Sequence, residues 1–102
     1  MMGLLKRRKQ PMYRPGAAVR PRPGISAAER DGRAVLLDLK GERYYGLDEV
    51  GARLWTAFAA GATARAAAEA LVDEYDAPLA TLIADAEAFA SRLVDAGLLE
   101  VV

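Results

Sequence analysis

The chain has 102 residues, a formal net charge of zero, and neither cysteine nor histidine. A chain of this length is expected to form one domain with a single modest core. Without cysteine it has no thiol nucleophile and no disulfide framework, and without histidine it lacks the commonest general base. A zinc site of cysteine and histidine ligands is excluded as well. The absence of cysteine also fits a cytoplasmic protein.

The zero net charge is a cancellation between two parts of the chain. Residues 1–24 contain seven basic and no acidic residues, whereas residues 25–102 contain 7 basic and 14 acidic residues. Four of the five prolines also lie in residues 1–24. Because proline fixes φ and donates no backbone hydrogen bond, this composition predicts a basic, disordered tail over residues 1–24 and a folded domain over residues 25–102.

The beginning of the sequence does not resemble a signal peptide. Gln10, Pro11 and Arg14 follow the basic run 6–9, where a signal peptide would have an apolar segment. No stretch approaches the 18 or so uninterrupted apolar residues that predict a membrane span. We therefore expect a protein without a membrane partner.

The first folded segment is expected to be a three-stranded antiparallel meander. Asp31-Gly32 is typical of a two-residue hairpin turn of type I′, because both residues tolerate a positive φ, and Lys40-Gly41 predicts a second, weaker turn of this kind. The expected strands span residues 25–30, 33–39 and 42–46.

The second turn sets the register of the last two strands. It places Asp38 opposite Arg43 and Leu37 opposite Tyr44, and the matched charges of the first pair favour this register over a slip by one residue. Because side chains alternate along a strand, Tyr44 and Tyr45 cannot enter the same core. One of them packs under the helices, and the other stands on the outer face or beside a groove.

Three helices are expected after the strands. Asp48 and Thr63 are suited to cap the first two helices, and Pro78 fits the first turn of the third. Gly61 and Gly97 are suited to end the first and third helices. The helices are expected to run to about residues 60, 75 and 96, and residues 98–102 can add a short final strand. This order predicts an α+β, winged-helix-like domain.

The residues do not form a catalytic constellation, and the charge argues against DNA. No histidine is present to activate the few hydroxyl groups. A winged helix often reads DNA with one helix, but residues 62–102 contain two basic and eight acidic residues, and this excess of negative charge repels phosphate. We therefore expect no enzymatic activity, no cofactor or metal, and no nucleic-acid partner, although the basic tail leaves non-specific attachment open.

The third strand is expected to be an edge of the sheet, with unpaired backbone groups. Edges are normally protected by charge, proline or a covering element, and here Tyr44-Tyr45 makes the edge adhesive instead. The tyrosines fit two interpretations, a simple preference for strand residues or an aromatic wall for a guest peptide. An exposed edge beside an apolar helix favours the second, because a peptide can add there as a further strand.

Residues 36–55, LLDLKGERYYGLDEVGARLW, resemble the PqqD-like family, the recognition elements for ribosomally synthesised and modified peptides. The resemblance continues through residues 63–75 and the closing residues 95–99. The YYGL form is most similar to the stand-alone B1 proteins of lasso peptide clusters. One departure is Asp48, where the family more often has Asn, and both residues cap helices.

The resemblance implies a winged-helix fold whose third strand and third helix hold the leader of a precursor peptide as an added antiparallel strand. In lasso systems the leader usually carries a Tyr-x-x-Pro element, and the implied partner is a leader peptidase of the transglutaminase-like type (B2-like). The peptide-binding positions implied in this sequence are Glu42, Arg43, Tyr44, Tyr45, Gly46, Leu82, Asp85, Ala86, Phe89 and Leu93.

Three functions therefore remain open from the sequence. The first is recognition of a lasso precursor leader and its delivery to a peptidase. The second is a PqqD-type chaperone for another modified peptide, with a radical-SAM enzyme as partner. The third is a winged-helix regulator that binds DNA.

Overall fold

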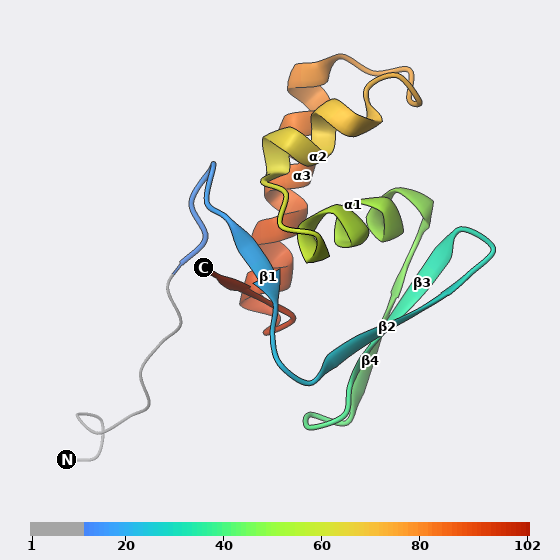
Figure 1. The fold of residues 1–102 in the computed structure, drawn as a ribbon, viewed down its shortest axis with the longest axis vertical. Coiled ribbons are helices and arrows are strands. Elements are labelled where there is room, and N and C mark those ends of the chain that lie inside the picture. The colour runs from blue at the N-terminus through green and yellow to red at the C-terminus, as the bar shows by residue number, and fades with distance from the viewer. Residues whose placement is uncertain (1–11) are drawn as a thin grey trace.

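The structure, a computed structural model, describes residues 12–102. Four strands precede three helices, and a short strand follows the last helix (Figure 1). The helices lie together on one side, and a long hairpin sheet extends away from them. The elements are β1 (Val19–Pro21), β2 (Ile25–Arg30), β3 (Arg33–Asp38), β4 (Arg43–Leu47), α1 (Glu49–Ala59), α2 (Ala64–Leu71), α3 (Leu79–Asp95) and β5 (Leu99–Val101).

Strands β2, β3 and β4 form the predicted antiparallel meander, in the order β2-β3-β4. The first turn is as predicted, because Asp31 and Gly32 have φ values of 54° and 81° and so both adopt the left-handed conformation that a type I′ turn requires. This α+β arrangement of a three-stranded sheet and three helices confirms the predicted fold class.

The second turn differs from the prediction, although its register is confirmed. Asp38 pairs with Arg43, but the connection is a four-residue turn, residues 39–42, and the positive φ of 55° falls on Glu42. The cause is the Asp38 carboxylate, which accepts hydrogen bonds from the Gly41 backbone N–H at 3.0 Å and from Arg43 at 2.9 Å. This side chain organises the turn, so the two strands end one pair earlier than a two-residue turn would allow.

The predicted caps are confirmed at the beginnings of α1 and α2 and at the end of α3. The Asp48 carboxylate accepts a hydrogen bond from the Gly51 backbone N–H at 2.8 Å, and Thr63 caps α2 through the Ala66 N–H at 3.2 Å. At the end of α3, Gly97 has a φ of 80°, and its N–H and that of Leu98 donate to carbonyls of the last turn. This cap turns the chain sharply from α3 into β5.

The boundary between tail and domain is wrong in the prediction. The domain does not begin near residue 25, because β1 pairs with β5 in a second, two-stranded sheet, with Val19 opposite Val101. Val19 is only 1% exposed and belongs to the core. The extended conformation that Pro21 favours here serves a strand at a sheet edge. The predicted disorder of residues 1–11 lies outside the described residues.

The core lies between the helices and the inner face of β3. Apolar side chains of α1 are buried in it, including Leu54 and Phe58, and Trp55 is also in the core, being only 5% exposed. The rings of Phe58 and Phe89 stack with centroids 6.4 Å apart, which joins α1 to α3. Leu36 reaches the same core from β3. This packing fixes α3 at a set distance from the sheet.

Candidate peptide-binding groove

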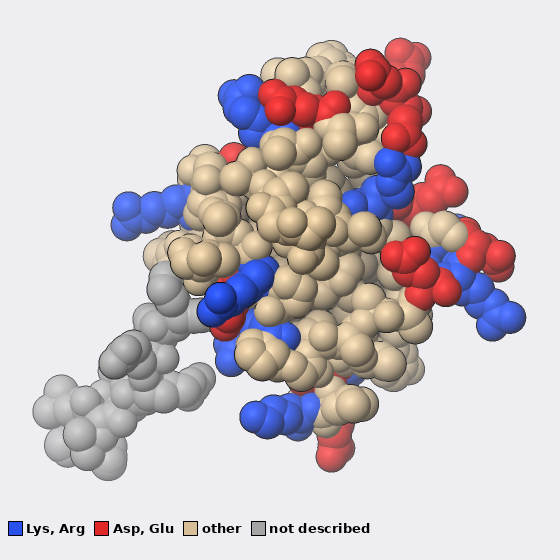
Figure 2. Space-filling view, in the orientation of Figure 1, with Lys and Arg blue, Asp and Glu red and all other residues tan. Residues whose placement is uncertain are grey.

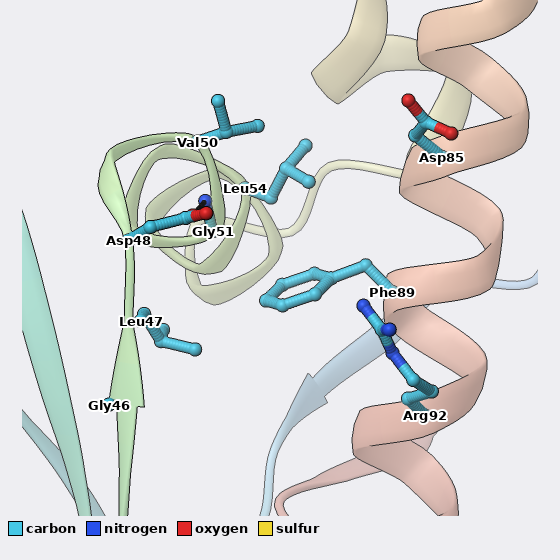
Figure 3. Close-up of a pocket in the computed structure, with 9 residues that line it drawn as sticks. All are labelled: Gly46, Leu47, Asp48, Val50, Gly51, Leu54, Asp85, Phe89 and Arg92. Atoms are coloured by element: carbon cyan, nitrogen blue, oxygen red, sulfur yellow. Dashed lines mark hydrogen bonds between the residues drawn. The ribbon is translucent and has the colours of Figure 1, made fainter.

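An open cavity of about 300 Å³ lies between the end of β4, the first turns of α1, and α3. Figure 3 shows its two walls, with the strand and α1 on one side and α3 on the other. We call this cavity the groove. It is lined by Gly46, Leu47, Asp48, Val50, Gly51, Leu54, Asp85, Phe89 and Arg92.

Phe89 forms the middle of the groove. Its side chain extends from α3 toward α1 and the end of β4, and Leu47 and Leu54 lie on the facing wall (Figure 3). At Gly51 an added Cβ atom would lie at an ordinary contact distance of 3.5 Å from the Phe89 ring, and its tight neighbour would be the Asp48 carboxylate at 3.2 Å. The groove is therefore apolar at its centre.

Charged side chains lie at the two ends of the α3 wall. Asp85 lies on one side of Phe89 and Arg92 on the other (Figure 3). Both residues are exposed, and the Arg92 guanidinium lies 6.0 Å from the centre of the Phe89 ring. The groove thus offers an apolar surface with a carboxylate at one end and a guanidinium at the other.

Arg43 ties the beginning of β4 to the end of α3. Its guanidinium donates to the Asp38 carboxylate and, at 3.2 Å, to the Ala96 carbonyl, and it also lies 5.5 Å from the centre of the Tyr45 ring. The Arg43 hydrogen bond is the main cause that lowers the pKa of Asp38, and the Gly41 N–H lowers it further. Arg43 therefore bridges the two walls.

The outer edge of β4 completes the candidate site. Within residues 12–102, β4 pairs only with β3, so its other edge keeps unpaired backbone groups, as predicted. An edge of this kind can accept an extended peptide through main-chain hydrogen bonds. The groove adds an apolar wall next to that edge.

The structure brings some of the predicted site residues together and separates others. Gly46, Asp85 and Phe89 line the groove. The other predicted helix residues are not in the lining, since Ala86 and Leu93 are buried and Leu82 is half-buried. On the strand side, Tyr45 is half-buried and Glu42 lies in the turn. Arg43 is held by hydrogen bonds to Asp38 and Ala96. Tyr44 is 77% exposed and shares the outer face of the sheet with Leu37 and Val35, away from the helices.

Sequence reasoning missed part of the lining. Four further residues line the groove although the sequence did not predict them as site residues, namely Leu47, Val50, Gly51 and Leu54. Arg92 was counted only as a charge. The spacing along the helix could have identified Arg92, which follows Phe89 by three positions and Asp85 by seven. Residues at these spacings lie on the same helix face.

Other kinds of site find no support in the part of the chain that the structure describes. No group of three or more Asp and Glu side chains there is arranged to hold a metal ion. Among the same residues, no helix is long and apolar enough to cross a membrane. Acidic side chains gather over the connection between α2 and α3, at the upper right of Figure 2, and such a surface disfavours contact with nucleic-acid phosphates.

The family described as coenzyme PQQ synthesis protein D (PqqD) matches residues 33–99, and the chain belongs to this family. No curated protein matches the chain. Among solved structures, the chain is similar to TbiB1 in complex with the TbiA(beta) leader peptide, with 31% identity, a TM-score of 0.74, and coverage of 79% of this chain and 94% of the other. It is also similar to a lasso peptide synthetase B1 complexed with the leader peptide, with 29% identity, a TM-score of 0.74, and coverage of 81% and 98%.

Proposed function

We propose that this protein binds the leader segment of a ribosomally synthesised precursor peptide, in lasso peptide biosynthesis, as a strand added to the free edge of β4. The observation that carries the proposal is the conjunction of that free edge with an apolar groove on its α3 side. The two similar solved structures, each a B1 protein with a leader peptide, support the same ligand class.

The free edge of β4 beside the groove suits an extended peptide, because such a peptide can pair with that edge. Main-chain hydrogen bonds to β4 give affinity that depends little on sequence, and side chains that enter the groove give selectivity. Phe89 offers an aromatic surface on which a leader side chain can pack, and Leu47 and Leu54 complete the apolar contact. Of the predicted contacts, we retain Gly46, Asp85 and Phe89 as direct ones, and we assign Ala86 and Leu93 to support of the helix wall.

We further propose that the protein is not an enzyme and delivers the bound leader to a separate processing enzyme, a leader peptidase of the transglutaminase-like type, in the cytoplasm. The absence of cysteine and histidine from the whole sequence supports a division of labour in which the partner carries the chemistry. A radical-SAM partner is the alternative for a different modified peptide. The neighbouring genes distinguish these two partners.

The direct test is a binding titration, measured by isothermal calorimetry. The purified chain is titrated with the leader of the precursor peptide that is encoded beside its gene. We expect saturable one-to-one binding, and the precursor should remain intact by mass spectrometry after incubation with this protein alone. Addition of the neighbouring peptidase should then give cleavage. The proposal is wrong if the folded protein does not bind the leader, and reproducible cleavage by the isolated protein would overturn its non-catalytic role.

A further inference from the structure

We infer that the groove selects peptides in which a basic, an apolar and an acidic residue follow one another at every second position, in that order from the N-terminus. This inference rests on the proposed function, because it specifies the peptide that the same groove takes. It is carried by the order of charges along α3, the direction of β4 and the spacing between the charges.

The charges have a fixed order along the helix. Asp85, Phe89 and Arg92 all line the groove from one face of α3, with the aromatic ring between the two charges (Figure 3). Seven residues separate Asp85 from Arg92, which at 1.5 Å per residue places their backbones about 10 Å apart along the axis. Asp48, on the facing wall, lies nearer to the Asp85 end in the same view. The groove therefore has an acidic end and a basic end.

The direction of β4 relative to α3 follows from contacts at its two ends. The first residue of β4, Arg43, reaches the carbonyl of Ala96, just after α3, at 3.2 Å. The last, Leu47, lines the groove together with Asp85 and Phe89. The strand and the helix therefore run in opposite directions, and β4 begins at the basic end of the groove.

These directions set the orientation of a guest strand. Both strand pairs in the β2-β3-β4 sheet are antiparallel, and antiparallel pairing is more stable per residue than parallel pairing, so a guest should also pair antiparallel to β4. Such a guest runs parallel to α3. Its N-terminal part then meets Asp85, and its C-terminal part meets Arg92.

The spacing selects alternate positions of the guest. An extended peptide rises about 3.4 Å per residue, and side chains on one face recur at every second residue. Side chains at positions i and i+4 are therefore roughly 14 Å apart and can reach charges about 10 Å apart on the helix, while position i+2 lies over the ring. A basic residue at i meets Asp85, an apolar residue at i+2 packs on Phe89, and an acidic residue at i+4 meets Arg92.

Neighbouring charges do not reverse this order. Glu49 and Asp95 are exposed, but neither lines the groove. The Arg43 guanidinium at the basic end is engaged by Asp38. Asp85 and Arg92 therefore set the preference of the α3 wall, through complementary charge at the two ends of the bound peptide.

The test uses two synthetic peptide libraries of equal composition. Both have the same randomised residues around a central aromatic position, and the first carries Lys two residues before it and Glu two residues after it, whereas the second carries these two residues exchanged. Affinity selection on the full chain should enrich the first library at least tenfold over the second. The precursor leader is measured in parallel as a separate control of the proposed function.

Matched variants assign the preference to the groove. Exchanging the charges by Asp85→Arg with Arg92→Asp should invert the preference between the libraries. The control exchange, Arg65→Glu with Glu69→Arg on α2, swaps an exposed ion pair outside the groove and should leave the preference unchanged. Arg92→Gln serves as a milder variant, which should lose only the discrimination at the acidic position even if the double exchange destabilises α3.

The outcomes separate the two hypotheses. If the folded protein binds neither the precursor leader nor either library, the proposed function itself is wrong. If it binds the leader but does not enrich the first library over the second, or if the charge exchange leaves the preference as it was, the inferred charge order is overturned.

Discussion

The two edge strands of the β2-β3-β4 sheet, β2 and β4, both have backbone N–H and C=O groups that are unpaired within residues 12–102, but the side chains around them differ. Strand β2 carries Ser, Ala, Glu and Arg and is almost entirely exposed, and only Ile25, at its start, is half-buried. Strand β4 carries two tyrosines, a glycine and a leucine, and its final residues lie beside α1 and α3. The free backbone groups are therefore accompanied by an apolar wall at one edge and by solvent at the other.

This difference shows what turns a sheet edge into a candidate binding site. An edge supplies hydrogen-bonding groups to any extended chain, and natural proteins normally suppress such pairing. On β2, small and charged side chains give little for a partner to bury. On β4, Phe89 and Leu54 give apolar contact that main-chain hydrogen bonds alone do not provide. We therefore expect selectivity to depend on the helix wall more than on the strand.

The largest effect should come from a proline on β4 compared with one on β2. Val35 pairs with both Ala28 and Gly46, and in an antiparallel sheet it exchanges hydrogen bonds with only one of them. The pair that closes the two-residue turn, Arg30 and Arg33, is hydrogen-bonded, and hydrogen-bonded pairs recur at every second pair. Val35 therefore bonds to Ala28, and the N–H of Gly46 points away from β3. Gly46→Pro should weaken leader binding by more than a hundredfold, or about 2.7 kcal/mol, in a calorimetric titration.

The matched control for this change is Ala27→Pro, because Ala27 also directs its N–H away from β3 by the same alternation. It should leave the leader affinity within a few-fold of the unsubstituted protein, and both variants should keep a cooperative thermal transition. Equal losses from the two prolines would mean that the guest does not distinguish the edges, and that the contrast between them is wrong.

The next effect concerns the helix wall. Asp85→Arg should weaken leader binding by roughly 1–3 kcal/mol, because the substitution reverses a charge and adds bulk at one end of the groove. Its thermal midpoint should barely change, since exposed substitutions usually stay within about 0.5 kcal/mol. Glu69→Arg, an equal charge reversal on exposed α2, is the control. Undiminished affinity in folded Asp85→Arg would place the leader elsewhere.

A smaller effect should come from the second sheet, which holds the end of α3. Val19 is buried on β1, opposite Val101 of the strand that follows α3. Val19→Ala should lower the free energy of unfolding by about 1–2 kcal/mol, measured by urea denaturation. Val35→Ala on the outer sheet face should cost less than about 0.5 kcal/mol. If both cost the same, β1 is not part of the folded domain.

The smallest effect should come from the bridge between the groove walls. Arg43 lowers the pKa of Asp38. The ion pair therefore contributes its full stability at pH values above the ordinary pKa of the carboxyl group, about 4. The contribution is lost as the pH falls further, through the lowered pKa. Arg43→Ala should therefore reduce the acid-side decline of the melting temperature. It should also weaken leader binding by less than tenfold, because β4 is no longer tied to Ala96.

Arg53→Ala is the matched comparison for the bridge. Arg53 forms a bidentate ion pair with Glu74 at 2.6 and 2.7 Å and lowers the pKa of that carboxylate, but it does not line the groove. This variant should change the acid-side stability and leave the leader affinity intact. A loss of affinity in Arg53→Ala comparable to that in Arg43→Ala would remove the specific role of the bridge.

Local chemistry explains which parts of the structure could be predicted from the sequence. Asp31-Gly32 and the facing charges of Asp38 and Arg43 lie close together in the chain, so they fix the hairpins and their register locally. Strand β1 could not be found in this way, because its partner β5 lies about 80 residues later and its own sequence has no strand periodicity. Pairing over such a distance depends on how α3 packs.

The candidate site was predictable only in part for the same reason. Gly46, Asp85 and Phe89, which line the groove, were implied as site residues by the resemblance to the PqqD-like family and not by any local pattern. Whether an apolar residue such as Leu47 lies in the core or lines a groove depends on how far α3 stands from β4, which no local pattern encodes. Tyr44 and Tyr45 were both expected at the site, and alternation along β4 sends Tyr44 to the opposite face.

The antiparallel pairing of β1 with β5 has a consequence for how the domain can be combined with others. Val19 lies opposite Val101, so the first and last strands of the described chain lie side by side. None of the residues of β1 or β5 lines the groove. A domain whose two ends meet can be inserted into a loop of another protein, or joined to it by short connectors, without stretching its own fold. Connectors at these two strands would not involve any residue that lines the groove.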